Sequence, residues 1–543
     1  MPPAFPALAG WEDAFHEILS YLRPSEYFVF DDEDEVATRF FLRRTLLSLA
    51  VSCRAFFDPA LDMLWHSLDN IHPLLKLLPN YQCLDSIYYL EGDIPPEAWS
   101  RLKTYAARVR GITFSRKANI DAGVWWTILE QCQGIPLLPN LRKLHTIKLN
   151  AIHIFVLRAF ASPSLRDVFL EFYEDLDGDR SPSSMAPIAG SALQEFSIKA
   201  TEITRLCLYP DLTIGREDLM CLSRFTQLEE LYLNDHLVLD EDLLFMLNGL
   251  KNIRFLKIPI LLRGPPESTQ VHLPYEFHNL TGLDLCGPPA HLARFIVASS
   301  MPRLNDLSIW FGPHHSDGIE TYLTSICRHI GPHTLAHFTA QLSSFVHAPQ
   351  LLMRLLEPLL PFAQLEEVVV RQADSLPLRD EDLARISHAW PKLRMLRFDQ
   401  STTALEDPDR QPGSTARSTL AGLVDLARGC PHLTELCIPE LDASVLPPIA
   451  GVPLMGHGPL DLCIENLVGA EDEETQLDVA VILDRLFPCL DLDYGIKEQR
   501  NYGGNANPYT AESENVSKLL RVMQLGREHY PRGVEPLGRL ASA

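Results

Sequence analysis

The sequence predicts an α/β fold in which strand and helix alternate many times, preceded by a smaller all-helical module. Three observations support this. The chain has 543 residues, more than the roughly 250–300 at which a single packed core stops growing. One short apolar phrase recurs along most of the chain, and helical spacing fills the segments between its copies. We therefore expect a repeat array, not a set of unrelated domains.

The recurring phrase consists of an apolar residue, two variable residues, an apolar residue, one variable residue and a final apolar residue. Its period of two predicts a strand. A further match at 203–208 starts only ten residues after the copy at Leu193, so one of the two is not a repeat strand, and 460–464 is a candidate extra strand. Twelve copies begin at Val109, Leu141, Leu165, Leu193, Leu228, Ile253, Leu280, Leu304, Leu335, Leu365, Leu393 and Leu433.

Between copies, apolar residues recur three and four apart, which predicts helices. A helix–turn–strand unit cannot bury its strand and its helix alone, so neighbouring units are expected to stack into a curved parallel sheet with helices on the convex side. The copies lie about 29 residues apart on average, and the pattern resembles the longer, ribonuclease-inhibitor-like leucine-rich repeats. An ordinary doubly wound α/β domain is the alternative. The predicted helices lie at 240–250, 291–301, 318–330, 380–390 and 418–430.

The array is expected to span 105–493 with about 12 repeats. Segments rich in Pro, Ser and Gly, at 177–190, 263–274 and 400–418, are expected to be surface loops. Outside the array we expect a disordered terminus at 1–10, a helical linker or cap at 69–104, and a C-terminal cap and tail at 494–543. The C-terminal cap is predicted to contain a helix at about 510–528, with an apolar stripe of Val516, Leu519, Leu520 and Met523.

Residues 11–68 lack the repeat phrase and contain three segments of helical spacing, at 15–22, 42–57 and 59–68. The segment resembles the F-box, the adaptor-binding module of ubiquitin ligases that are built from a Skp-type adaptor, a cullin and an F-box subunit. The whole chain is similar to fungal F-box proteins with C-terminal leucine-rich repeats. The motif positions that match are Ile18, Leu19, Tyr21, Leu22, Pro24, Leu46, Leu47, Leu49, Cys53, Arg54, Phe56, Leu64 and Trp65.

The module departs from the F-box pattern in two places. The family's opening Leu-Pro falls on Gly10 and Trp11, and an insertion of about twenty residues at 25–43 carries the acidic run Asp31–Glu35. That run is either a solvated loop or a contact to a basic partner, and the module as a whole could instead cap the array. The resemblance implies an adaptor-binding set of Phe15, Ile18, Leu19, Leu22, Pro24, Leu46, Leu49, Cys53, Leu64 and Trp65.

The resemblance implies a substrate-recognition subunit of a Skp/cullin/F-box ubiquitin ligase, which acts by proximity and is not itself an enzyme. The sequence has no nucleotide-binding loop, nucleophile elbow or paired Cys/His spacing, so we expect no catalytic residues, no metal and no cofactor. The doublet His314–His315 is interpreted as part of a turn. The alternative function is a leucine-rich-repeat scaffold for protein interactions, with a degenerate F-box and no ligase role.

The side chains that alternate with the buried positions of each strand are expected to line one open face. Large and charged residues there are candidates for binding a protein substrate of unknown identity. Two arginines among them would form a positive spot for an acidic or phosphorylated peptide, unless Arg397 pairs with Asp399, Glu366 or Glu367. The candidate substrate-binding residues are Tyr232, Asn234, Trp310, Arg371, Arg397 and Asp399.

The composition restricts the partners and the compartment. A net charge of −24 argues against nucleic acid, because binding to phosphate backbones depends on Lys and Arg. The eleven cysteines contain no Cys-x-x-Cys pair, which predicts reduced thiols. No signal peptide or membrane-length apolar segment stands out, so we expect no membrane association and a cytoplasmic or nuclear location.

Overall fold

A computed structural model of the protein divides into two compact units, which we call unit 1 (1–259) and unit 2 (260–543). The first predicted helix contributes a helical turn at 17–20. Residues outside the described ranges include Phe15, Pro24, His314 and His315, and most of the three predicted surface loops. The described residues are 17–23, 33–115, 119–147, 149, 156–172, 186–210, 214–234, 237, 239–262, 275–312, 318–331, 334–342, 352–372, 378–400, 417–455, 460–491 and 511–529.

Two longer helices follow in the N-terminal module, α2 (Glu33–Ser52) and α3 (Arg54–His66). They separate at Cys53, whose backbone is extended, so the single helix predicted at 42–57 is wrong. The predicted insertion is also partly helical, because 33–43 forms the first half of α2. This stretch contains neither Gly nor Pro, so nothing in it interrupts the helix.

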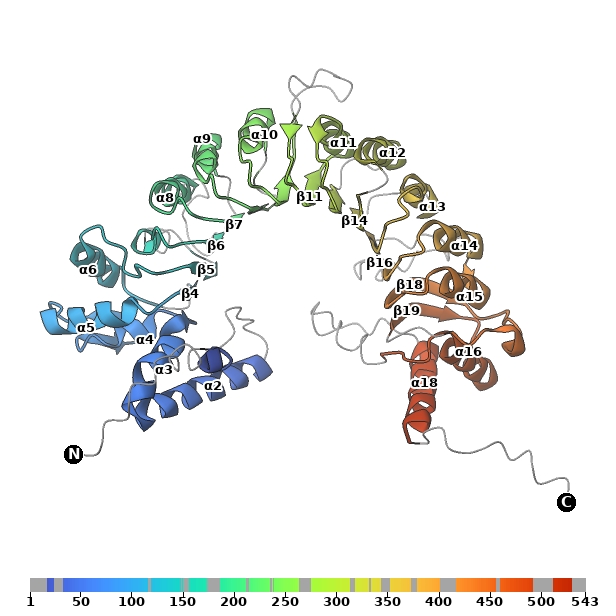
Figure 1. The fold of residues 1–543 in the computed structure, drawn as a ribbon, viewed down its shortest axis with the longest axis horizontal. Helices are drawn as coiled ribbons and strands as arrows, with labels where there is room; N and C mark the ends of the chain where they lie inside the picture. Colours follow the sequence, from blue (N-terminus) through green and yellow to red (C-terminus); the bar gives the residue numbers. More distant parts are fainter. Residues whose placement is uncertain are drawn as a thin grey trace. The chain divides into compact units, whose positions relative to one another are not determined.

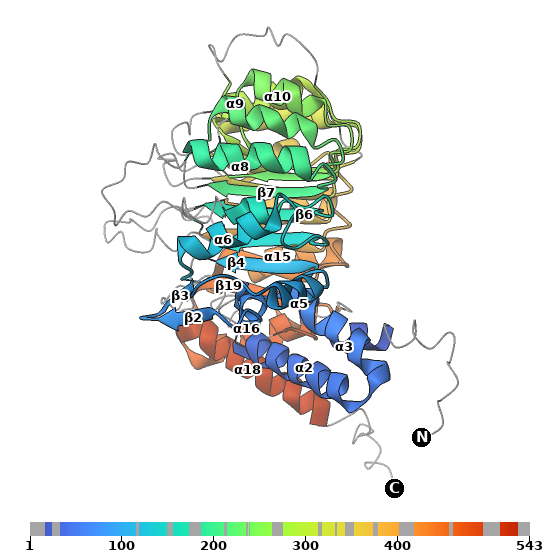
Figure 2. The same cartoon turned by 90° about the vertical axis from the view of Figure 1, so that its left-hand side faces the viewer.

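The segment 69–104 is not purely helical. It contains α4 (His72–Leu75), an antiparallel hairpin of β2 (Tyr81–Leu84) and β3 (Ile87–Leu90), and the start of α5 (Pro96–Ala106). Asp85 and Ser86 both have positive φ, as a tight two-residue hairpin turn requires. Figures 1 and 2 show α3 beside α5.

In unit 1 the repeat strands form one parallel sheet, in which each strand pairs with the next along the chain. The sheet begins with β1 (Ser67–Leu68), which pairs with β4. Figure 1 shows α6 (Ala122–Cys132), α8 (Ala186–Lys199), α9 (Arg216–Leu219) and α10 (Glu241–Asn248) on one side of these strands. The other strands are β4 (Gly111–Ser115), β5 (Lys143–Ile147), β6 (Asp167–Phe172), β7 (Arg205–Pro210), β8 (Glu230–Leu233) and β9 (Phe255–Pro259).

The structure settles which of the two closely spaced phrases, 193–198 or 203–208, is a strand. The copy at Leu193 lies inside α8, whereas 205–210 is β7 and pairs in register with β6. The other eleven copies of the phrase fall on strands, and 461–468 is the extra strand. In two of the repeats of unit 1, a short 3-10 turn takes the place of a longer helix. These turns are η2 (Leu157–Ala159) and η4 (Met220–Arg224).

Unit 2 repeats this arrangement, with a parallel sheet and helices on one side (Figure 1). The strand β17 (Ser418–Thr419) pairs with the C-terminal half of β18, and a short parallel pair joins β10 (Tyr275–Glu276) to β12 (Ser299–Ser300). The main strands are β11 (Gly282–Gly287), β13 (Asp306–Phe311), β14 (His337–Leu342), β15 (Glu367–Gln372), β16 (Met395–Gln400), β18 (Glu435–Asp442) and β19 (Asp461–Val468).

The helices of unit 2 confirm the predicted positions. The C-terminal helix buries Val516 and Leu520 of its predicted apolar stripe. The helices are α11 (Pro289–Val297), α12 (Ile319–Ile330), α13 (Leu352–Leu356), α14 (Asp380–Ala389), α15 (Leu420–Gly429), α16 (Glu473–Leu486) and α18 (Ala511–His529), and the 3-10 turns are η5 (Glu357–Leu359) and η7 (Ile449–Gly451).

Several repeat strands, among them β5, β6, β8, β13 and β14, alternate buried with partly or fully exposed side chains. In β6, for example, Val168, Leu170 and Phe172 are buried against the helices, whereas Asp167 and Phe169 are partly exposed on the opposite face. All eleven cysteines are free. The fold is therefore of the α/β class, a leucine-rich-repeat solenoid with parallel strands on one face and helices on the other, which confirms the prediction.

Candidate protein-interaction surfaces

The helix α2 presents large apolar side chains to solvent. Phe40, Leu47 and Val51 lie on one helical face at spacings of seven and four residues, and Phe41 flanks them. Phe40 is 69% exposed and Val51 is 76% exposed. We call these four residues the α2 stripe. Ile18 and Tyr21, on the helical turn that precedes α2, are also exposed.

Several residues implied by the F-box resemblance form the interior of the module instead. Leu19 and Leu46 are buried, so neither can contact a partner in this arrangement. Leu49, Leu64 and Trp65 pack against a small core of Ala50, Ala60 and Leu61. These residues therefore hold the helices together and only indirectly support a docking surface.

The remaining members of that set are divided. Ile18 and Cys53 are exposed, and Leu22 is half-buried. None of the four residues of the α2 stripe was among the predicted contacts, although Leu47 matched the F-box motif. The signal for them was present in the sequence, because FFLRRTLLSLAV is apolar on two helical faces and a helix can bury only one of them against its own module.

Ion pairs join the module to the first repeats of unit 1. Arg39 on α2 is almost fully buried and contacts Asp69 at 2.7 Å, and Arg43 also bonds Asp69. Arg108, at the end of α5, donates to Asp58 of α3 at 2.6 Å and also bonds Asp62. Trp65 of α3 packs against Tyr105 of α5, with ring centroids 4.8 Å apart. Packing and ion pairs thus fix α2 and α3 relative to the first strands.

A band of aromatic side chains crosses the open strand face of unit 1. His145 and Phe169 are opposite each other in the register of β5 and β6, and their rings meet at 4.4 Å. Phe169 stacks on Tyr209 at 5.2 Å, and Tyr232 stacks on Phe255 at 4.9 Å. We call these five residues the aromatic band. Partly exposed, rigid rings of this kind are typical of protein-binding hot spots.

A charged cluster lies within the aromatic band. Arg205 contacts Glu230 at 3.2 Å and Asp167 at 4.0 Å, and its guanidinium lies 5.2 Å from the centre of the Tyr232 ring. Burial alone would lower the pKa of Arg205, but Asp167, Cys207, Tyr232 and Glu230 together outweigh it and raise the pKa. The Tyr232 hydroxyl donates to Glu230 at 3.1 Å. The cluster therefore holds Tyr232 in a fixed orientation.

Burial lowers the pKa of His145, so this ring is neutral near physiological pH. Asn234, a predicted contact residue, follows β8 and is partly exposed, and its backbone N–H donates to Leu208 at 3.2 Å. Of the predicted contacts in unit 1, both Tyr232 and Asn234 thus reach the open face. The candidate set did not include His145, Phe169 or Tyr209. Tyr209 could be identified only after 205–210, and not the copy at Leu193, was known to be the strand.

In unit 2 the open face brings together only part of the predicted set. Trp310, Gln341, Arg371 and Asp399 occupy one register row across four adjacent strands, so Gln341 separates the Trp from the Arg. Arg371 is exposed. Arg397 lies in another register row. Its side chain is buried and donates to Glu435 at 2.6 Å. The predicted spot of two exposed arginines is therefore wrong.

The described part of the chain contains no group of three or more His, Cys, Asp or Glu residues placed to hold a metal ion. Among the same residues, no helix is both long and apolar enough to cross a membrane. The groups that these surfaces present are aromatic rings, ion pairs and exposed apolar side chains.

No family model matches the chain, and no curated protein matches it. Among solved structures, similarity is found to the leucine-rich-repeat-containing protein LegL7 from Legionella pneumophila, at 15% identity and a TM-score of 0.28 over 49% of this chain and 85% of that one. A protein from Bacteroides fragilis has 16% identity and a TM-score of 0.25, over 51% and 60% of the two chains. The structure of a yeast complex of Rad7 and Elc1 has 12% identity and a TM-score of 0.33, over 74% and 92%.

Proposed function

We propose that the protein is the substrate-recognition subunit of a Skp/cullin/F-box type ubiquitin ligase in the cytoplasm, the nucleus or both. The N-terminal module docks on the adaptor and through it on a cullin, and the repeats hold a protein substrate. The protein forms no bond itself. It raises the local concentration of the substrate near a recruited conjugating enzyme.

The α2 stripe is the observation that carries this proposal. Burying a large apolar side chain stabilises a complex by about 1.5–3 kcal/mol, so four exposed ones on a single helix form a strong potential contact. A neighbouring face of the same helix already packs in the module core, through Leu46 and Ala50. A helix that is apolar on both faces is typical of one buried between two bodies.

Co-expression with a Skp-type adaptor tests the proposal. We expect the unmodified chain to co-purify with the adaptor, and Ile18→Asp and Leu47→Asp each to abolish this, because a charge on an exposed apolar contact must be desolvated. Phe245→Asp is the matched control, since Phe245 is a 52% exposed aromatic on α10, away from the module. Failure of the unmodified chain to bind any adaptor would remove the ligase assignment.

A leucine-rich-repeat scaffold without a ligase role is the second candidate. It is favoured by the extension of α2 through residues that F-boxes lack, so the docking helix begins well before the family motif. In that case the aromatic band would still bind a protein, and the α2 stripe would contact something other than the adaptor. The co-purification experiment separates the two candidates.

A further inference from the structure

Three arginines occupy equivalent positions at one edge of the unit 1 sheet. Arg110, Arg142 and Arg166 each directly precede a strand, β4, β5 and β6. The backbone N–H of Arg142 donates to the carbonyl of Arg110 at 2.7 Å, and that of Arg166 donates to Arg142 at 2.9 Å. Neighbouring strands are about 4.8 Å apart, so the three side chains start from adjacent rungs. We call them the arginine strip.

The two outer arginines cap carbonyl groups of their own turns. Arg110 donates to Ala107 at 2.7 Å, and Arg166 donates to Pro163 at 3.0 Å. Each guanidinium has five N–H donors, so most of its hydrogen-bonding capacity is still available. Arg166 also forms an exposed ion pair with Glu202 at 3.7 Å, which is too long for a hydrogen bond.

The central arginine differs, because the carbonyl that it would cap is already satisfied. The Pro139 carbonyl accepts hydroxyl hydrogen bonds from Ser162 at 2.7 Å and from Ser164 at 3.0 Å. Arg142 is exposed, and the described residues give its side chain no hydrogen bond and no ion pair. Its guanidinium is therefore available to a ligand without any rearrangement of the protein.

Acidic side chains compensate the charge of the strip only in part, through Glu202 beside Arg166 and Asp62 beside Arg110. The pKa of Arg110 is lowered by burial and by the charge of Arg142, against an opposing effect of Asp62. Arg110 and Arg142 thus lie close enough to repel each other, in a chain whose net charge is −24. Such an arrangement favours an anion, because bound negative charge relieves the repulsion.

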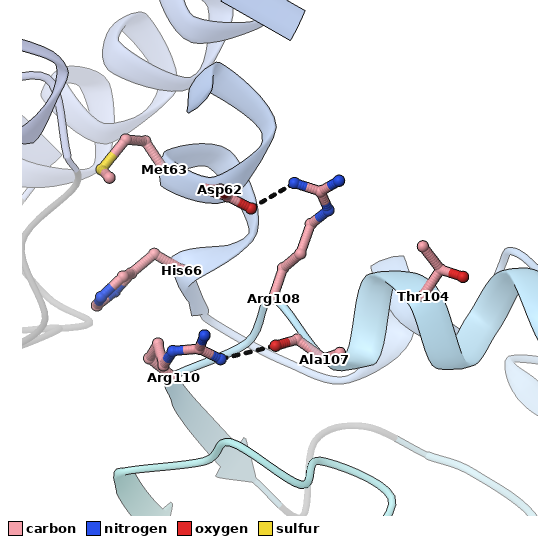
Figure 3. Close-up of a pocket in the computed structure, with 7 residues that line it drawn as sticks. All are labelled: Asp62, Met63, His66, Thr104, Ala107, Arg108 and Arg110. Atoms are coloured by element: carbon pink, nitrogen blue, oxygen red, sulfur yellow. Dashed lines mark hydrogen bonds and ion pairs between the residues drawn. The ribbon is translucent and has the colours of Figure 1, made fainter. Parts of the chain in front are cut away.

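A pocket of about 410 Å³ adjoins one end of the strip (Figure 3). Arg110, His66 and Thr104 line it, together with Asp62 and Arg108. Figure 3 shows Arg108 turned toward Asp62, to which it is hydrogen-bonded, whereas Arg110 is bonded to the Ala107 carbonyl. The charge of Arg108 is thus neutralised by Asp58 and Asp62 of α3. Arg110 belongs both to the pocket and to the arginine strip.

We propose that the arginine strip binds an extended acidic segment of a partner protein, with carboxylate or phosphate oxygens paired to Arg110, Arg142 and Arg166. Guanidinium groups form bidentate, charge-assisted hydrogen bonds with both kinds of anion. The pocket beside Arg110 accommodates the larger anionic group. This inference rests on the part of the proposed function in which the repeats bind a protein, and it is independent of adaptor docking.

Fluorescence anisotropy of labelled peptides with the full chain tests the proposal. The probes share one sequence and differ only in a central run of glutamates, phosphoserines or serines. We expect both anionic peptides to bind, the serine peptide not to bind, and affinity to fall as salt is added. The ratio between the anionic peptides shows whether carboxylate or phosphate is preferred.

Two variants make the test specific. Arg142→Glu should weaken binding about tenfold or more, because it replaces a charge-assisted pair with repulsion. Arg254→Glu is the matched control, since Arg254 directly precedes β9 in the same unit but lies 3.4 Å from Glu229. Equal affinity of Arg142→Glu and the unmodified chain, or equal losses in both variants, would overturn the proposal. Adaptor co-purification should be unchanged in Arg142→Glu, which separates this test from that of the α2 stripe.

Discussion

Arg397 on β16 donates to Glu435 on β18 at 2.6 Å, with side chains that are only 10% and 11% exposed. The two residues are diagonal in the register, because Arg397 is opposite Cys437 and Glu435 is opposite Met395. The pair is therefore an internal contact between neighbouring strands of unit 2. It explains why an arginine occupies a strand position on a face where partner binding was expected.

Loss of the Arg397 side chain should destabilise the protein strongly. Arg397→Ala removes the charged partner at 2.6 Å from the buried Glu435 carboxylate, which costs about 3–5 kcal/mol. Urea unfolding followed by circular dichroism measures this change. The double variant Arg397→Met/Glu435→Leu is the control and should lie close to the unmodified protein, because two apolar side chains need no pairing. Equal destabilisation in the single and double variants would contradict this account of the pair.

The stacked rings of Phe169 and Tyr209 should be energetically coupled. Their centroids are 5.2 Å apart with nearly parallel planes, a geometry that contributes about 0.5–1.5 kcal/mol beyond area burial. A double-mutant cycle with Phe169→Ala and Tyr209→Ala, read by urea unfolding, measures the coupling. The same cycle with Phe169→Ala and Phe255→Ala, which do not stack on each other, should give additive effects. Additivity in both cycles would show that the aromatic band is not a packed unit.

Stability should depend on the ionisation of Asp306 on β13. Burial raises the pKa of Asp306; His337 opposes this shift, whereas Glu367 and Asp284 add to it. Because the folded state holds the proton more tightly than the unfolded state, this residue's contribution to stability is lost as pH rises above about 3.9 through the raised pKa. Asp306→Asn removes the ionisation, so the variant should gain stability relative to the unmodified protein across this window.

Urea unfolding at a series of pH values between about 4 and 7 measures this difference. Asp425→Asn, at a half-exposed position on α15, is the control for the loss of a surface carboxylate. Parallel stability curves for Asp306→Asn and the unmodified protein would show that Asp306 is not destabilising when charged.

The repeat array could be predicted because each strand carries its own local signal. The choice between 193–198 and 203–208 was ambiguous because both segments match the strand phrase. The buried residues Ala189, Leu193 and Phe196 follow helical spacing, whereas Ile198 is exposed, and only this longer pattern identifies α8. The hairpin at 81–90 was missed because its turn residues, Asp85 and Ser86, are not the Asn-Gly or Asp-Gly pair that marks such turns.

The candidate sites were less predictable, because they depend on contacts between distant residues. The pairing of Arg397 with Glu435 spans 38 positions and depends on how β16 and β18 align, which local patterns do not encode. The arginine strip likewise depends on the register of three strands. In the N-terminal module, motif matching identified Leu46 and Trp65, which form its core, but the exposed Phe40 and Val51 follow from the length and phase of α2.

Backbone hydrogen exchange of the purified protein, measured with and without a purified Skp-type adaptor, tests the central proposal most directly. Docking through the N-terminal module predicts slower exchange at residues 17–23 and 33–57, around the α2 stripe, with exchange in β13–β16 unchanged. Unchanged exchange in α2 at saturating adaptor, or protection confined to the repeat strands, would contradict docking through this module.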